Sequence, residues 1–160
     1  MATLPQLIEE DVRRLDDTLR EFLAQTDATV ALVIDKGGFL LAHQGDAGEL
    51  DLTTVGALAS GAFMASQTLA GLVSEKDFNH TFQQGEKNSL FTVNVDEHCL
   101  LVVVFPSTAG VGIVKYYSAN AVRDIARQLA AARERNPAAG LDLSEMNVAA
   151  PQELFRKKAV

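Results

Sequence analysis

The side chains that most often carry out catalysis are few in this sequence and lie far apart along it. None of the three histidines has a cysteine or carboxylate at metal-ligand spacing; they are His43, His80 and His98. Cys99, the single cysteine, opens an apolar run and is predicted to be a core residue rather than a nucleophile. Neither a metal site nor a disulfide is predicted.

The sequence also gives no evidence of a serine nucleophile or a phosphate-binding loop. Ser60 and Ser66 lack the strand–turn–helix surroundings of a nucleophile elbow. Gly37-Gly38 is too short for a phosphate loop, and no Gly-x-x-x-x-Gly-Lys-Ser/Thr motif occurs. We therefore predict no catalytic residue and no cofactor, and we interpret the chain as an interaction protein rather than an enzyme.

Composition narrows the class of partner. The chain has 160 residues, 48% of them hydrophobic, which is enough for the core of one domain plus an appendage. Its net charge of −7 argues against non-specific nucleic-acid binding, which needs a basic face. The acidic start, MATLPQLIEED, does not resemble a signal peptide, so a cytoplasmic location is the simplest expectation.

One long stretch, residues 51–75, carries no charge between its flanking acids, Asp51 and Glu75. The rest of the domain must hold this stretch in position. Ala, Leu and Met favour helix there. The carboxylate of Asp51 can accept a hydrogen bond from an otherwise unpaired N–H of the first turn. We therefore predict a helix with Asp51 as its N-cap.

This helix has two uncharged stripes about half a turn apart. The larger side chains form a stripe that we predict packs on the helix's own domain: Val55, Leu58, Ala62, Leu69, Leu72 and Val73. The smaller ones form a stripe that we predict faces another protein: Ala57, Ser60, Gly61, Met64, Gln67, Thr68 and Gly71. Arginine at Met64 or Thr68 should then be tolerated by the fold, whereas arginine at Leu58 should unfold it.

Two alternative roles for the apolar helix stay open. Its length would span a bilayer, but Gln67, several Ser and Thr, and flanking acids with no basic bias argue against a membrane span. A helix buried entirely within its own domain is the second alternative. A domain of this size seldom surrounds one helix completely, so an interface remains the preferred interpretation.

Apolar periodicity and turn residues predict an α/β fold, an α+β sandwich of order α-β-β-α-β-β-β-α. The five-stranded, mostly antiparallel sheet should carry helices on both faces. Predicted helices are residues 4–24, 51–75 and about 118–134; predicted strands are residues 28–35, 39–44, 89–95, 99–105 and 112–117, with 81–84 only as an extension of the third.

Pro137 should end the last helix and divide the chain into a domain, residues 1–135, and a tail, residues 136–160. The Pro, Gly and Ala content of the tail's first half predicts mobility. Pro151 begins a segment, residues 151–158, that could form a short basic helix with Leu154 and Phe155 as its apolar contacts. A tail without function is the alternative.

Five segments in this order and spacing resemble the Roadblock/dynein-light-chain domain family, above all its bacterial MglB-type members. They are VALVIDKGGFLLAHQG, DLTTVGALASG, F-x-x-x-F-x-x-G-E-K-x-SLF, LLVVVF and VGIVK, and the likeness covers roughly residues 6–134. MglB-type proteins regulate small Ras-like GTPases of the MglA type. The resemblance thus implies a GTPase regulator connected with cell polarity and motility.

The resemblance also implies an assembly. Two copies would pair through their third strands, here Ser89, Phe91, Val93 and Val95, and the paired central helices would dock the GTPase switch regions through Ala57, Ser60, Gly61, Met64, Gln67 and Thr68. Hydrolysis would be accelerated without an arginine finger, and residues 51–75 contain no Arg or Lys to insert. The family's C-terminal extension also contacts the GTPase, but this tail differs in sequence.

Two other functional classes stay open. One is a scaffold or adaptor dimer that binds a GTPase or a motor component without changing its rate. The other is a small-molecule sensor, which the lack of convergent polar groups disfavours.

Overall fold

Eight elements follow one another in the predicted order. The computed structural model of the protein describes residues 6–135. Its helices and strands are α1 (Glu9–Gln25), β1 (Val30–Asp35), β2 (Leu40–Gly45), α2 (Leu52–Leu72), β3 (His80–Gln84), β4 (Asn88–Asn94), β5 (Cys99–Pro106) and α3 (Val111–Arg135). The predicted α+β class and element order are confirmed.

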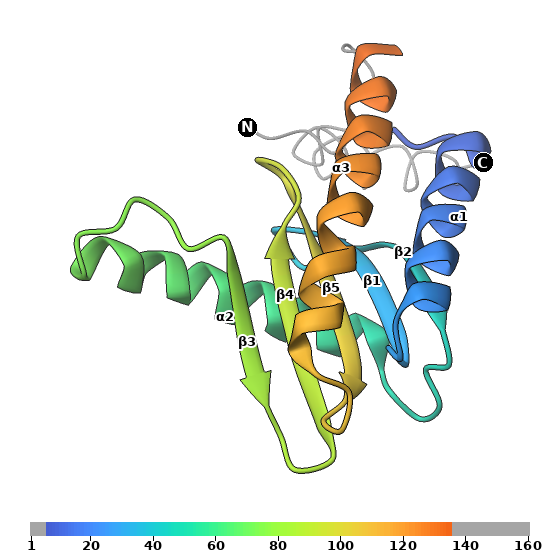
Figure 1. Ribbon diagram of the computed structural model, residues 1–160. Helices are drawn as coiled ribbons and strands as arrows, with labels where there is room; N and C mark the ends of the chain where they lie inside the picture. The colour runs from blue at the N-terminus through green and yellow to red at the C-terminus, as the bar shows by residue number, and fades with distance from the viewer. Residues whose placement is uncertain (1–5, 136–160) are drawn as a thin grey trace, which may run out of the picture.

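The five strands form one antiparallel sheet in the spatial order β2-β1-β5-β4-β3 (Figure 1). β1 and β5 occupy its middle and are apolar almost throughout, as expected of strands covered on both faces. β2 and β3 are the two edges. The edge strand β3, HTFQQ, is mostly polar and partly exposed, and this explains why its sequence carries only a weak strand signal.

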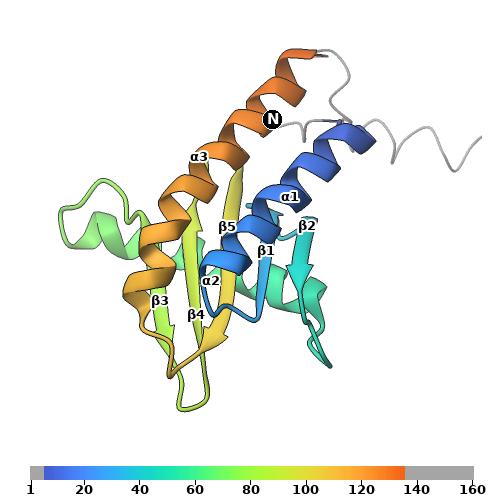
Figure 2. The same ribbon diagram turned by 45° about the vertical axis from the view of Figure 1, so that its right-hand side comes forward.

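Helices cover both faces of the sheet, as predicted (Figures 1 and 2). α1 and α3 pack together on one face, over a core that includes Leu19, Phe91 and Ile125. α2 crosses the other face, where its Phe63 packs in a smaller core with Ile34 and other side chains of β1 and β5. The alternating side chains of the central strands therefore supply two separate cores.

The predicted strand at 112–117 is wrong, because these residues form the first turns of α3. β-branched and aromatic residues there favour strand, but buried positions recur with helical spacing from Val114 and Ser118 through to Ala132. α3 thus begins several residues before its predicted start near residue 118. The fifth strand is instead β3, which the sequence suggests only as an extension.

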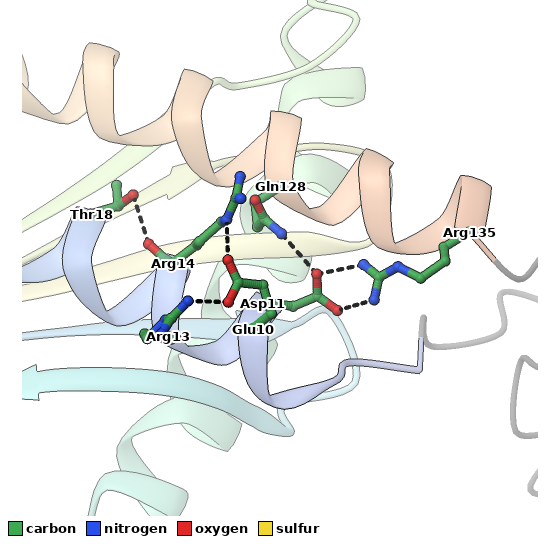
Figure 3. Close-up of polar contacts among 7 residues, drawn as sticks. All are labelled: Glu10, Asp11, Arg13, Arg14, Thr18, Gln128 and Arg135. Atoms are coloured by element: carbon green, nitrogen blue, oxygen red, sulfur yellow. Dashed lines mark hydrogen bonds and ion pairs between the residues drawn. The ribbon is translucent and has the colours of Figure 1, made fainter.

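A buried carboxylate joins the start of α1 to the end of α3 (Figure 3). Asp11 is fully buried and accepts hydrogen bonds from the Ile8 N–H at 2.9 Å and the Gln128 amide at 2.7 Å. The Arg135 guanidinium donates to both carboxylate oxygens, at 2.6 and 3.0 Å. These contacts compensate the buried charge and fix the last turn of α3. By contrast, Glu10 pairs with Arg13 and Arg14 on the exposed surface.

Replacing Asp11 with alanine should lower the free energy of unfolding by about 2 kcal/mol, because it removes a helix cap and a two-oxygen Arg contact. Urea denaturation would measure the change. Asp17→Ala, in the same helix, is the matched control. Its partner Arg20 and Asp17 itself are both exposed, so its loss should cost less than about 0.5 kcal/mol. Equal costs for the two variants would contradict the structural role of Asp11.

The contact between Asp11 and Arg135 should also affect how the free energy of unfolding depends on pH. Hydrogen bonds from Arg135, opposed by burial, lower the pKa of Asp11 overall. A carboxyl group whose pKa is lowered by folding stabilises the fold at pH values above its ordinary pKa of about 4. This stabilisation is lost as the pH falls through the lowered pKa of the folded state. The difference in stability between the wild type and Asp11→Ala should therefore narrow at acidic pH.

Candidate protein-binding surface

α2 begins as predicted. The Asp51 carboxylate accepts hydrogen bonds from the N–H of Thr54 at 3.2 Å and from its hydroxyl at 2.6 Å. These bonds hold the pKa of the Asp51 carboxyl below its usual range. The helix ends at Leu72, and Ser74 adopts a left-handed conformation with φ 64°, which turns the chain away. A rigid helix therefore carries the uncharged face.

The face of α2 that packs on the sheet differs from the predicted one. Its buried residues are Gly56, Ala59, Ser60, Phe63 and Ala70. Phe63 is only 2% exposed and lies among Ile34, Leu100 and their neighbours. The predicted inner stripe is instead mostly outside. The prediction that Leu58, Leu69, Leu72 and Val73 face the sheet is therefore wrong.

Small residues explain this orientation. Ser60 is buried, and its hydroxyl donates to the Lys36 carbonyl in the turn between β1 and β2 at 2.5 Å. Gly38 of that turn has φ 92°, and a Cβ there would lie 2.9 Å from the Cα of Ala57. Gly56 likewise lies against Ile34, where an added Cβ would come within 3.1 Å. Because the backbone of α2 lies close to the sheet on the side of these small residues, the leucines face away from the sheet.

Four of the six predicted docking residues share one exposed line on α2, which we call the docking line: Ala57, Gly61, Met64 and Thr68. The other two are engaged within the fold. Ser60 is buried, and the Gln67 side chain donates to the Phe78 carbonyl at 2.8 Å and accepts from the Phe78 N–H at 3.0 Å. Ser60 therefore has almost no exposed surface for direct docking, and Gln67 remains partly exposed while its amide is hydrogen-bonded. They fix the helix and the segment that follows it.

A second exposed line lies next to the docking line. We call it the leucine seam: Leu58, Ala62, Ala65, Leu69 and Leu72. Leu58 is 70% and Leu72 is 77% exposed. The alternating spacing of four and three residues is the one that places side chains in the contact seam of two packed helices. The seam adjoins a groove of about 590 Å³ between α2 and β3–β4, to which Leu50, Val55, Leu90 and Val104 contribute apolar walls.

The predicted dimer strand lies inside the sheet. Ser89, Phe91 and Val93 belong to β4, which is hydrogen-bonded to β5 on one side and to β3 on the other, and Val95 follows its end. β4 therefore has no open edge, and its assignment as a pairing strand is corrected. The third strand of the chain is β3. Its outer edge is open and its five residues include no Lys or Pro to block pairing.

Catalytic groups do not converge anywhere near this surface. Cys99 is buried, and burial is the main cause that raises the pKa of its thiol to about 12. Burial and then the nearby Lys115 lower the pKa of His80. Residues 6–135 contain no group of three His, Cys, Asp or Glu side chains that could hold a metal ion. The predicted tail contacts, Leu154 and Phe155, lie outside the described residues.

The fold and sequence together identify the family. The family model for the Roadblock/LC7 domain matches residues 14–105, more than half of the chain. The chain belongs to the Roadblock/LC7 domain family. A comparison with curated protein sequences finds no significant match.

Solved structures place it near the MglB members of this family. The gliding protein MglB from Thermus thermophilus is 35% identical, with a TM-score of 0.74, covering 81% of this chain and 98% of that one. An MglB described with a tetrameric arrangement is 34% identical, with a TM-score of 0.77, covering 82% and 99%. Myxococcus xanthus MglB is 25% identical, with a TM-score of 0.73, covering 79% and 95%.

Among the described residues, α2 is the one helix that is long and apolar enough to cross a bilayer by length and composition. Its inner face packs on the sheet through Ala59 and Phe63, but only 28% of the apolar stretch is buried. The docking line and the leucine seam lie on the exposed part of the helix. Exposed apolar patches of this kind often mark protein-binding sites.

Proposed function

We propose that this Roadblock-family regulator is a homodimer that binds a small Ras-like GTPase of the MglA type and accelerates its GTP hydrolysis. The observation that carries the proposal is the exposed, uncharged outer face of α2 beside an open strand edge. A single chain covers neither feature. The similarity to MglB proteins supports a regulatory role.

The dimer would form through β3 and the leucine seam. Two β3 edges can pair antiparallel about a two-fold axis and join two sheets into one. In both views α2 runs past β3, so its last turns project beyond the edge of the sheet (Figures 1 and 2). Pairing at β3 would bring these turns toward the α2 of the second copy. The exposed Leu69 and Leu72 would then pack along the partner's Leu58 and the apolar groove.

The docking line would remain outside this contact and receive the GTPase. Ala57, Gly61 and Thr68 are small, so a partner can approach the helix backbone closely, and Met64 supplies an adaptable apolar contact. α2 contains no Arg or Lys. Activation would therefore act by fixing the GTPase's own catalytic residues in place, and those residues and Mg²⁺ would stabilise the charge on the transferred phosphoryl group.

A hydrolysis assay tests the proposal and separates it from its alternative. The rate of GTP hydrolysis by an MglA-type GTPase from the same genome is measured with and without this protein, alongside direct binding. Acceleration together with binding is the expected result. Binding without acceleration would instead identify a scaffold or adaptor dimer, and the absence of binding would contradict both functions.

A further inference from the structure

A second groove, polar at its rim, lies on the other side of α2 from the leucine seam. It has a volume of about 610 Å³ and runs between α2, residues 77–79 and the turn from β4 to β5. Its apolar surface comes from Phe63, Met64 and Phe78, and its charged residues are Lys36, Asp77, Asp96 and Glu97. Met64 also belongs to the docking line, so the groove and the line form one continuous surface.

The walls of this groove are held by hydrogen bonds. The two bonds between the Gln67 side chain and the backbone of Phe78 fix residues 77–79 against α2. In the opposite wall, Asp96 accepts hydrogen bonds from the N–H groups of His98 and Cys99, both at 2.8 Å. Because its walls are already fixed, the groove loses little conformational entropy when it binds a ligand.

The charge of the groove selects a basic ligand. Three carboxylates line it against a single ammonium group, that of Lys36. Asp96 is already paired with Arg133 of α3, at 3.1 Å. Asp77 and Glu97 are exposed at the rim and remain for a ligand. A segment with one or two apolar side chains followed by cations matches this arrangement of an apolar floor and an acidic rim.

The chain itself contains such a segment. Leu154 and Phe155 are followed directly by Arg156, Lys157 and Lys158. These residues are connected to α3, which ends at Arg135, two residues after the Arg133 that contacts the groove residue Asp96. The 18 intervening residues, 136–153, could reach at most roughly 60 Å. The connection is therefore long enough to pass around the turn from β4 to β5.

We propose that residues 154–158 of this chain dock in the groove between α2 and the turn from β4 to β5, with Leu154 and Phe155 on its apolar floor and the cations at Asp77 and Glu97. Bound there, the segment covers Met64. If the docking line binds a GTPase as proposed above, the tail competes with that partner and restrains the regulator. The docking itself does not depend on the partner.

Paramagnetic labelling of the full chain tests the docking without any GTPase. Ala159→Cys provides the attachment site for a nitroxide, and the native Cys99 should not react because it is buried and its pKa is raised to about 12. The expected result is loss of the amide signals of Met64, Asp77 and Glu97. Unchanged signals at these residues, or losses confined to another surface, would overturn the proposal.

Charge variants provide the matched controls. Asp77→Lys with Glu97→Lys should restore the amide signals around the groove, because the rim then repels the cations of the tail. Glu49→Lys with Glu86→Lys changes the net charge equally at exposed positions outside this groove and should leave the broadening unchanged. Equal recovery in both pairs would show that only the overall charge attracts the tail, and would overturn a specific site.

Competition with the partner is a separate measurement. Arg156→Glu, Lys157→Glu and Lys158→Glu together should raise the affinity for the GTPase, since the restraint is removed. Lower affinity would show that the tail contacts the GTPase directly and does not restrain it. If no GTPase binds at all, the proposed function fails while the labelling result still decides the docking.

Discussion

Replacing Met64 with arginine should weaken binding to the GTPase about 100-fold and leave the chain folded and dimeric. Met64 lies in the middle of the docking line, and its side chain is 45% exposed, so arginine can reach water in the free protein. In the complex the arginine would lose water in a close, uncharged contact. The groove beside Met64 does offer carboxylates, but an arginine turned toward them would still replace the apolar contact that Met64 makes with the partner. A cost of about 3 kcal/mol would weaken binding about 100-fold.

Titration with the GTPase and the hydrolysis assay would measure this effect. Thr68→Arg, one turn away on the same line, should behave in the same way. Ala119→Arg is the matched control, because Ala119 is also an exposed helical residue but belongs to α3 on the opposite face of the sheet. Normal stimulation by Met64→Arg would show that the GTPase docks elsewhere, whatever the state of the dimer.

The sequence predicts that α2 has an inner and an outer face, but it places the leucines on the inner face, whereas they are exposed. Both candidate stripes are uncharged, so charge cannot orient the helix, and hydrophobicity alone favours leucine over serine for the inner position. Phe63 lies on neither stripe, yet it is the large side chain that enters the core. An aromatic flanked at helical spacing by Ala59, Ser60 and Ala70 is the available signal, because small neighbours let a helix approach a sheet closely.

The sheet shows where local patterns are sufficient and where tertiary context decides. β1 and β5 are predictable because both of their faces are buried and their sequences are continuously apolar. β3 is an edge strand with polar residues, so its sequence carries little periodic signal. The start of α3 contains Ile113 and Tyr116, which favour strand, but both are exposed and the buried positions follow the helical period. Local propensity is overridden there.

These corrections change which residues should hold the dimer together. The resemblance implies pairing of the third strands, and the interior position of β4 moves that role to the open edge of β3. The sequence pattern places Leu58 against the sheet, where arginine would unfold the domain. Since Leu58 is 70% exposed, the structure leads to a different expectation: the fold survives and the contact between copies is lost.

Leu58→Arg should therefore yield a folded monomer. In the proposed dimer Leu58 of each copy packs against Leu69 and Leu72 of the other, so the two-fold axis places one arginine in each of two equivalent apolar contacts. Each would be desolvated without a partner charge, at a cost of several kcal/mol per dimer. Sedimentation at micromolar concentration should show the mass of one chain, 17.2 kDa, for the variant and twice that mass for the wild type. Circular dichroism would confirm that the variant is folded.

Two controls distinguish loss of the seam from loss of the fold. Phe63→Arg places the same charge in the core beneath α2 and should fail to fold, as a fully buried position requires. Met64→Arg lies on the neighbouring line and should remain a dimer. A wild-type chain that sediments only as a monomer would contradict the proposed assembly, and a dimeric Leu58→Arg would move the contact away from the leucine seam. Together these variants are expected to show that the leucine seam of α2 mediates self-association and that the adjacent docking line binds the GTPase.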